Sequence, residues 1–244
     1  MIIDFHTHGK LAKYLKFSPE YTDWLFGEAK AAGLDAVCLT EHFNTLGFST
    51  VYADIANRFP REGDAFDVNG LLVFPGMEVD IAESGHTLVL GTIEEILDFN
   101  HALEPHKEKD AFLPLAELAA EVRARGLFFG AGHPFRAPGH IPEQTPEALA
   151  AFEFVDLNGK DLAHDFEGTI AKTYALAERL GVPVVSGSDT HQAFQYGCVT
   201  THLDERVTTV AELRAQVLAG AYHIEYASDL AFKVKTAGML KRSL

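Results

Sequence analysis

The chain has 244 residues, of which 47% are hydrophobic, and its formal net charge at pH 7 is −15. This length suits one large α/β domain. The acidic excess argues against a nucleic-acid partner, whose binding surface needs Lys and Arg to replace counterions. No apolar run approaches membrane-spanning length, so we expect no membrane partner. Met1 is not followed by a signal-like segment, and Cys38 and Cys198 lie in apolar runs typical of buried, reduced thiols. We therefore expect a cytoplasmic protein.

Helical and strand-like segments alternate along the chain. The first helix is expected at 19–32, with Ser18 as its N-cap, Pro19 at its first position and Gly33 at its end. The same alternation predicts strands at 2–5, 34–39, 71–74, 87–90, 127–131, 152–155, 182–186 and 222–226, and helices at 113–125, 164–180 and 208–219. Strands separated by helices favour parallel pairing with right-handed crossovers. We expect a single domain over 1–244, with loops 60–68 and 138–146 long enough to be lids.

Imidazoles and carboxylates gather where the predicted strands end. His6-Thr7-His8 ends the first strand, and residues two apart on an extended chain point the same way, so both rings can bind one ion. Comparable groups follow at Thr40-Glu41-His42, Pro75-Gly76-Met77-Glu78, Gly132-His133-Pro134 and Ser188-Asp189-Thr190-His191, while His86 begins a strand. The carboxyl ends of parallel strands form the functional face of barrels and open α/β sheets. Histidine and carboxylate are the ligands that Zn, Mn and Fe share.

The candidates outnumber the roughly four ligands that one zinc ion needs. We therefore expect two or three divalent ions, Zn, Mn or Fe, sharing a bridging carboxylate. Ions about 3.5–4 Å apart suit phosphate-ester hydrolysis, in which a metal-bridging hydroxide attacks phosphorus and the ions neutralise the developing charge. The sequence contains no nucleophile elbow and no cysteine in a polar setting, which argues against serine or cysteine hydrolases.

In this order the motifs resemble the PHP (polymerase and histidinol phosphatase) family, from residue 2 to residue 191. The resemblance implies a distorted (β/α)7 barrel with a metal site at the C-terminal ends of the strands. It also implies three ligand sets, of which the first two share Glu78: His6, His8, Glu78 and Asp189; then Glu78, His86 and His133; then His42 and His191. The loop after His8 lacks a histidine that completes the third set in many family phosphatases, which leaves the third ion open.

Other residues are expected to support the reaction. We expect Glu78, Asp189 and His191 to act closest to the chemistry, and Glu41 to orient His42 instead of binding metal. Among the substrate-binding candidates, Arg136 can clamp a phosphate bidentately. Lys10 or Lys13 can add positive charge, and Asn158 can bind the substrate, brace the site or cap a helix.

The leading interpretation is a metal-dependent hydrolase, specifically a phosphoesterase that removes phosphate from a small phosphorylated metabolite. By resemblance, histidinol phosphate is one candidate substrate. Three alternatives stay open: a nuclease or phosphodiesterase, an amidohydrolase-type C–N hydrolase, and a non-catalytic metal-binding domain. The net charge of −15 counts against nucleic acid as a partner. No feature of the sequence predicts an oligomeric state.

Overall fold

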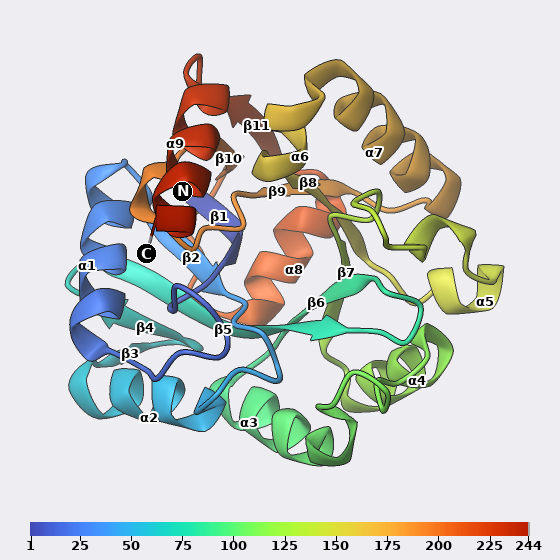
Figure 1. Ribbon diagram of the computed structural model, residues 1–244, viewed down its shortest axis with the longest axis horizontal. Helices are drawn as coiled ribbons and strands as arrows, with labels where there is room; N and C mark the ends of the chain where they lie inside the picture. Colours follow the sequence, from blue (N-terminus) through green and yellow to red (C-terminus); the bar gives the residue numbers. More distant parts are fainter. Residues whose placement is uncertain (244) are drawn as a thin grey trace.

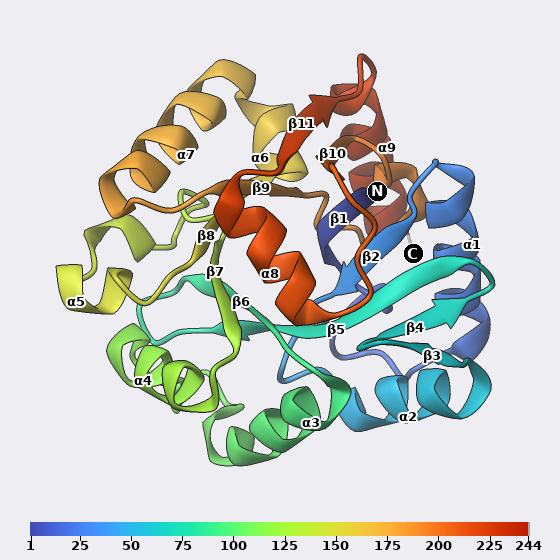
Figure 2. The ribbon, with the colours of Figure 1, turned by 180° about the vertical axis from the view of Figure 1, so that it is seen from behind.

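The computed structural model describes residues 1–243 and shows a barrel of strands surrounded by helices (Figures 1 and 2). The strands of the barrel wall follow one another in the order β1 (Ile2–Thr7), β2 (Ala36–Leu39), β5 (Leu71–Asp80), β6 (His86–Leu90), β7 (Phe128–Gly132), β8 (Phe154–Asn158) and β9 (Val184–Gly187). Neighbouring strands are parallel except that β6 is antiparallel to β5 and β7. The expected distorted (β/α)7 barrel is confirmed. Leu244, the last residue of the expected domain 1–244, lies outside the described residues.

The barrel closes where the end of β9 meets the end of β1. The backbone N–H of Asp189 donates to the carbonyl of His6 at 2.7 Å, and the N–H of His8 donates to the carbonyl of Thr190 at 3.0 Å. Beyond β1 the sheet continues, antiparallel, into β10 (Val199–Leu203) and β11 (Tyr222–Tyr226). The closure therefore brings two of the predicted motifs, 6–8 and 188–191, side by side.

Nine helices are present in residues 1–243: α1 (Pro19–Ala31), α2 (Phe48–Arg58), α3 (Ile93–Ala102), α4 (Leu115–Arg125), α5 (Pro146–Leu149), α6 (Gly159–His164), α7 (Phe166–Leu180), α8 (Val210–Ala219) and α9 (Leu230–Ser243). Three 3-10 turns join them: η1 (Glu104–His106), η2 (Ile141–Glu143) and η3 (Ala193–Gln195). The predicted start of α1 is confirmed, because the Ser18 side chain accepts from the Tyr21 N–H. Among these residues, no helix is both long and apolar enough to cross a bilayer.

One end of the barrel is filled by helix α8. Side chains of the barrel interior, such as Phe5 and Phe154, form one buried cluster with Leu213 and Val217 of α8. This cluster includes residues early in the strands, such as Ile3, so α8 covers the amino ends. The two views agree, placing α8 across the barrel and α9 on its opposite side (Figures 1 and 2). The carboxyl ends are thus left for polar groups.

A β-bulge in β1 turns His6 toward the site. In its pairing with β2, Asp4 lies opposite Val37 but Thr7 lies opposite Leu39, so β1 contains one extra residue. An extra residue reverses the alternation of side chains along a strand. Phe5 can therefore pack in the interior cluster while its neighbour His6 faces Asp156, which lies on the same side of β8 as Phe154. The Asp4 carboxylate supports the bulge by accepting the His6 N–H at 3.1 Å.

Among the differences from the sequence predictions, which include the unpredicted helices α2 and α3, two concern the ends of the barrel strands and the expected lid. Strand β5 does not end near Phe74 but continues to Asp80, because its second half changes partner from β2 to the antiparallel β6. Residues 60–68 are not a lid. They form a hairpin of β3 (Arg61–Glu62) and β4 (Ala65–Val68), which pairs with the amino half of β5, away from the carboxyl ends.

Gly187 tests the closure of the barrel. A Cβ at this position would lie 2.2 Å from the Cβ of His6, so Gly187→Ala should force β9 away from β1. We expect it to lower the free energy of unfolding by about 1–3 kcal/mol in urea denaturation. The matched control is Gly27→Ala on α1, where a Cβ meets nothing within 4 Å; it should raise stability by roughly 0.5–1 kcal/mol. Equal stabilities for Gly187→Ala and wild type would contradict the tight closure.

Candidate metal centre

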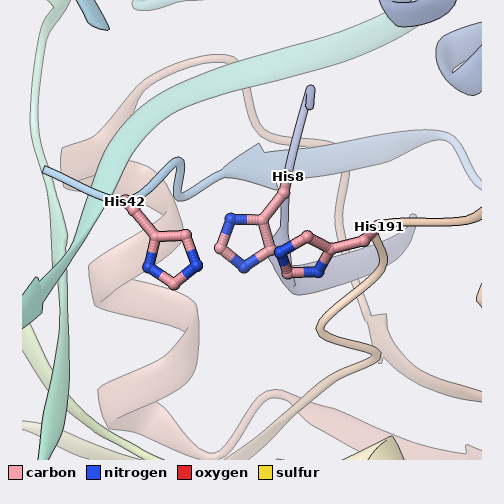
Figure 3. A group of neighbouring side chains, drawn as sticks. All are labelled: His8, His42 and His191. Carbon is pink, nitrogen blue, oxygen red and sulfur yellow. The ribbon is translucent and has the colours of Figure 1, made fainter. Parts of the chain in front are cut away.

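The structure brings all eight predicted ligands together at the carboxyl ends of the strands. They come from six chain segments: His6 and His8 from β1 and its end, His42 after β2, Glu78 in β5, His86 in β6, His133 after β7, and Asp189 and His191 after β9. His86 begins its strand and still reaches this face, because β6 runs antiparallel to its neighbours. Figure 3 shows the ring of His8 between those of His42 and His191.

Glu78 lies at the centre of this group. Its Oε1 is 2.6 Å from His86 Nδ1, 3.0 Å from His133 Nε2 and 3.4 Å from His6 Nε2. Its Oε2 is 3.0 Å from His42 Nδ1 and 3.4 Å from His8 Nε2. The side chain is 1% exposed. One buried carboxylate therefore faces five imidazoles, with each oxygen directed to a different subset of them.

The pKa values around Glu78 follow from this arrangement. Burial opposes ionisation of Glu78, but the positive charges of His86, His42 and His6 outweigh it and hold its pKa well below the usual range. Burial likewise opposes protonation of His86, yet the charge of Glu78 and a hydrogen bond to Asp80 raise its pKa to about 10. The pKa of His191 is lowered by burial and by the charge of His8. A neutral imidazole is the form that binds metal.

Three groups of these side chains have ligand atoms close enough to share an ion: His8, His42 and His191; His6, His8 and Asp189; and His6, Glu78 and His133. Each imidazole nitrogen has one lone pair in the ring plane and serves one ion. His8 and His6 each occur twice, so only the first and third groups can be filled at the same time. His6 Nε2, His8 Nε2, His42 Nδ1 and Glu78 Oε2 are buried without a hydrogen-bond partner in residues 1–243. Buried nitrogen and oxygen atoms that lack a hydrogen-bond partner are well suited to bind divalent ions.

A carboxylate lies behind three of the imidazoles. Asp156 Oδ2 is 3.0 Å from His6 Nδ1, and Asp80 Oδ1 is 3.1 Å from His86 Nε2. Glu41 Oε1 is 3.7 Å from His8 Nδ1 and accepts the His42 N–H at 3.0 Å. Such outer carboxylates fix the ring orientation of metal-binding histidines. Glu41 thus lies beside the ring of His8 and not that of His42, and its role as a supporting carboxylate stays a prediction.

Arg136 and Asn158 support the centre instead of lining it. The Arg136 guanidinium donates to Asp161 Oδ1 at 2.9 Å, to Asp189 Oδ2 at 2.6 Å and to Asn158 Oδ1 at 2.6 Å. Asn158 also caps α6, by accepting the Lys160 N–H. These three hydrogen bonds use three of the five guanidinium N–H groups and favour a role for Arg136 in holding Asp189, while its role as a phosphate ligand stays a prediction.

Lys10 does not reach the centre. It is 3% exposed, and its ammonium donates to Lys13 O, Thr45 Oγ1 and Leu46 O at 3.3, 2.9 and 2.7 Å. An ammonium has three N–H groups, so none is left for a substrate. Lys10 instead joins the loop after β1 to the loop after β2, which corrects its assignment as a substrate ligand. Lys13 lies nearer the centre, with its Nζ 3.8 Å from Asp80 Oδ2.

Two predicted ligands have an unusual backbone. His133 has φ +28° and Asp189 has φ +55°, two of four non-glycine residues in 1–243 with positive φ. Non-glycine residues in this region carry strain that the surrounding structure must hold. At Asp189 the bond from its N–H to the His6 carbonyl does so, and at His133 the N–H donates to Asp156 Oδ2 at 3.2 Å.

Sequence reasoning missed Asp80 and Lys160. Asp80 lies at the true end of β5, which the sequence placed too early. Lys160 follows the strand-end residue Asn158 and forms an ion pair with Asp189 Oδ1 at 2.8 Å. The only signal for Lys160 was its position directly after a predicted strand end. An ordinary lysine on a helix surface can have the same position, so this signal does not identify a site residue.

Asp156 offers a test of this support. Asp156→Asn keeps the size of the side chain but removes the charge beside His6 Nδ1, so the affinity for divalent ions should fall by about 10–100-fold. A competition titration of Zn²⁺ or Mn²⁺ against a chromogenic chelator measures this. The exposed Asp98→Asn on α3 is the matched control and should bind as wild type does. A folded Asp156→Asn protein with unchanged affinity would refute the supporting role.

Comparisons with known proteins add to this geometry. Residues 171–222 match the model of the PHP-associated family (PHP_C), while no curated protein matches the chain. PsfC from Pseudomonas syringae PB-5123 has a similar structure, with a TM-score of 0.81, 21% identity and coverage of 99% of this chain and 98% of that one. The lesion-specific endonuclease PfuEndoQ from Pyrococcus furiosus gives a TM-score of 0.67 at 17% identity. That alignment covers 92% of this chain and 58% of the endonuclease chain.

A further structure, from Bifidobacterium adolescentis and assigned as a metal-dependent phosphoesterase, gives a TM-score of 0.56. Its identity is 15%, and the coverage is 88% of this chain and 94% of that one. At these identities the structures establish a common fold. The family-model match, the common fold and the order of the strand-end motifs together support a PHP domain in this chain.

Proposed function

We propose that this chain is a metal-dependent phosphoesterase that removes phosphate from a small phosphorylated metabolite. The observation that carries the proposal is the position of Glu78, which directs one oxygen to His86, His133 and His6 and the other to His42 and His8. A carboxylate placed in this way can bridge two neighbouring ions, which is the arrangement of many hydrolases of phosphate esters.

The residues fit two ions without sharing a nitrogen. One ion would use His6, Glu78 and His133, with His86 beside them, and the other would use His8, His42 and His191, with Asp189 beside them. When bound, such ions polarise the phosphoryl oxygens and neutralise the negative charge that develops on them. Asp156 and Asp80 lie within hydrogen-bond distance of the His6 and His86 rings and hold them in place, so these two ligands need little rearrangement.

A cleft of about 720 Å³ beside His86 can take the organic part of such a substrate. This volume lies in the range of small-molecule sites. Ile81, Phe112 and Leu46 supply apolar surface, and a larger set contributes charge or hydrogen bonds: Lys13, Asn44, Asp80, Lys107, Glu108 and Lys109. The three lysines outnumber the two carboxylates of the cleft, Asp80 and Glu108, and on a chain of net charge −15 this excess favours an anionic ligand. The volume of the cleft suits a metabolite more than a duplex.

The proposal predicts metal-dependent release of phosphate. Purified protein loaded with Mn²⁺, Fe²⁺ or Zn²⁺ should hydrolyse a chromogenic phosphomonoester and members of a phosphometabolite panel. Asp189→Ala should lower kcat/KM on the order of a thousandfold or more, while Asp98→Ala should not change it.

The same assay separates the alternatives. Cleavage of short oligonucleotides without cleavage of monoesters would favour a nuclease, and hydrolysis of amide substrates alone would favour a C–N hydrolase. If metal-loaded protein acts on none of these substrates, the proposed activity is wrong.

A further inference from the structure

Lys160 places a positive charge at the edge of the candidate metal centre. It is the second residue of α6, and its Nζ lies 2.8 Å from Asp189 Oδ1. Its side chain is 32% exposed, whereas that of Asp189 is 4% exposed. The ammonium therefore joins a buried carboxylate to the solvent-facing side of the centre.

The two oxygens of Asp189 have different surroundings. Arg136 holds Oδ2 through an N–H bond of 2.6 Å and is itself fixed by Asp161 and Asn158. Oδ1 is the atom turned toward the histidines, 3.3 Å from His8 Nε2. An ion bound by His8, His42 and His191 would therefore meet Oδ1, which also lies 3.5 Å from His191 Nδ1. This is the same oxygen that Lys160 pairs with, and an ammonium and a divalent cation repel each other strongly at such short range.

Lys160 is also the cation that can leave its partner. A lysine has a flexible four-carbon stem and binds phosphate as a point charge. The Arg136 guanidinium, by contrast, is held by three oxygens. Lys241 of α9, which packs against α6, adds a second positive charge nearby: burial and the charge of Lys160 together lower its pKa.

We propose that Lys160 competes with a divalent ion for Asp189 Oδ1, and that it binds the phosphate of the substrate once it has given up that oxygen. The phosphate contact rests on the proposed phosphoesterase function, whereas the competition for Asp189 does not. The expected phosphate ligand, Arg136, is thereby replaced by a lysine that lies on the other oxygen of the same carboxylate.

The test compares Lys160→Met, which keeps the length of the stem but removes the charge, with Lys172→Met, an exposed lysine on α7. Chelator competition measures the affinity for Mn²⁺ or Zn²⁺. Calorimetry with inorganic phosphate, on ion-loaded protein, measures phosphate binding without any turnover. Circular dichroism and thermal unfolding check the fold, and Lys160→Arg provides a second variant that retains the charge.

We expect Lys160→Met to bind the ion about tenfold more tightly and phosphate about tenfold more weakly, in line with the loss of one charge-assisted contact. Lys172→Met should match wild type, and Lys160→Arg should bind phosphate within a fewfold of wild type. Unchanged or weaker ion binding in Lys160→Met would overturn the competition. Unchanged phosphate binding would overturn the phosphate contact. A wild type that binds phosphate through Lys160 but hydrolyses no ester would refute the proposed activity and leave this inference standing.

Discussion

The arrangement of this protein depends on one buried carboxylate, Glu78, surrounded by five imidazoles. A charge this deeply buried is costly unless it is compensated. In this barrel the compensation comes from the histidines and, when ions are bound, from the metal. The same requirement explains why so many strand ends contribute a histidine, since each ring faces one of the two carboxylate oxygens and offsets part of its charge. Glu78 thus organises the centre and makes it suited to more than one cation.

The barrel has two irregularities, and both serve this centre. The bulge in β1 lets Phe5 pack in the interior while His6 turns to Glu78 and Asp156. The reversed direction of β6 brings His86, a strand-initial residue, to the face where the other strands end. A regular parallel barrel would place His86 at the opposite end, under α8. The distortions from ideal geometry are therefore what completes the ligand set.

Sequence reasoning selected eight side chains that the structure brings together, because imidazoles and carboxylates at strand ends are informative whatever the details of packing. It could not place groups whose role depends on their neighbours. Lys10 and Arg136 both look like phosphate ligands in sequence, but the structure supplies each with enough oxygen partners to engage its cation. Asp80 and Lys160 look like surface residues, yet the pairing of β5 with β6 sets Asp80 beside His86, and the start of α6 sets Lys160 beside Asp189. The β1 bulge involves one residue and has no sequence signature.

The most direct measurement of the central claim is a crystal structure of the protein loaded with Mn²⁺ or Zn²⁺, with anomalous scattering recorded at the metal edge. Our account predicts two neighbouring ions, each in contact with a different oxygen of Glu78. One ion should lie near His6 and His133 and the other near His8, His42 and His191. A single ion, or ions that make no contact with Glu78, would contradict the role of Glu78 as the shared ligand.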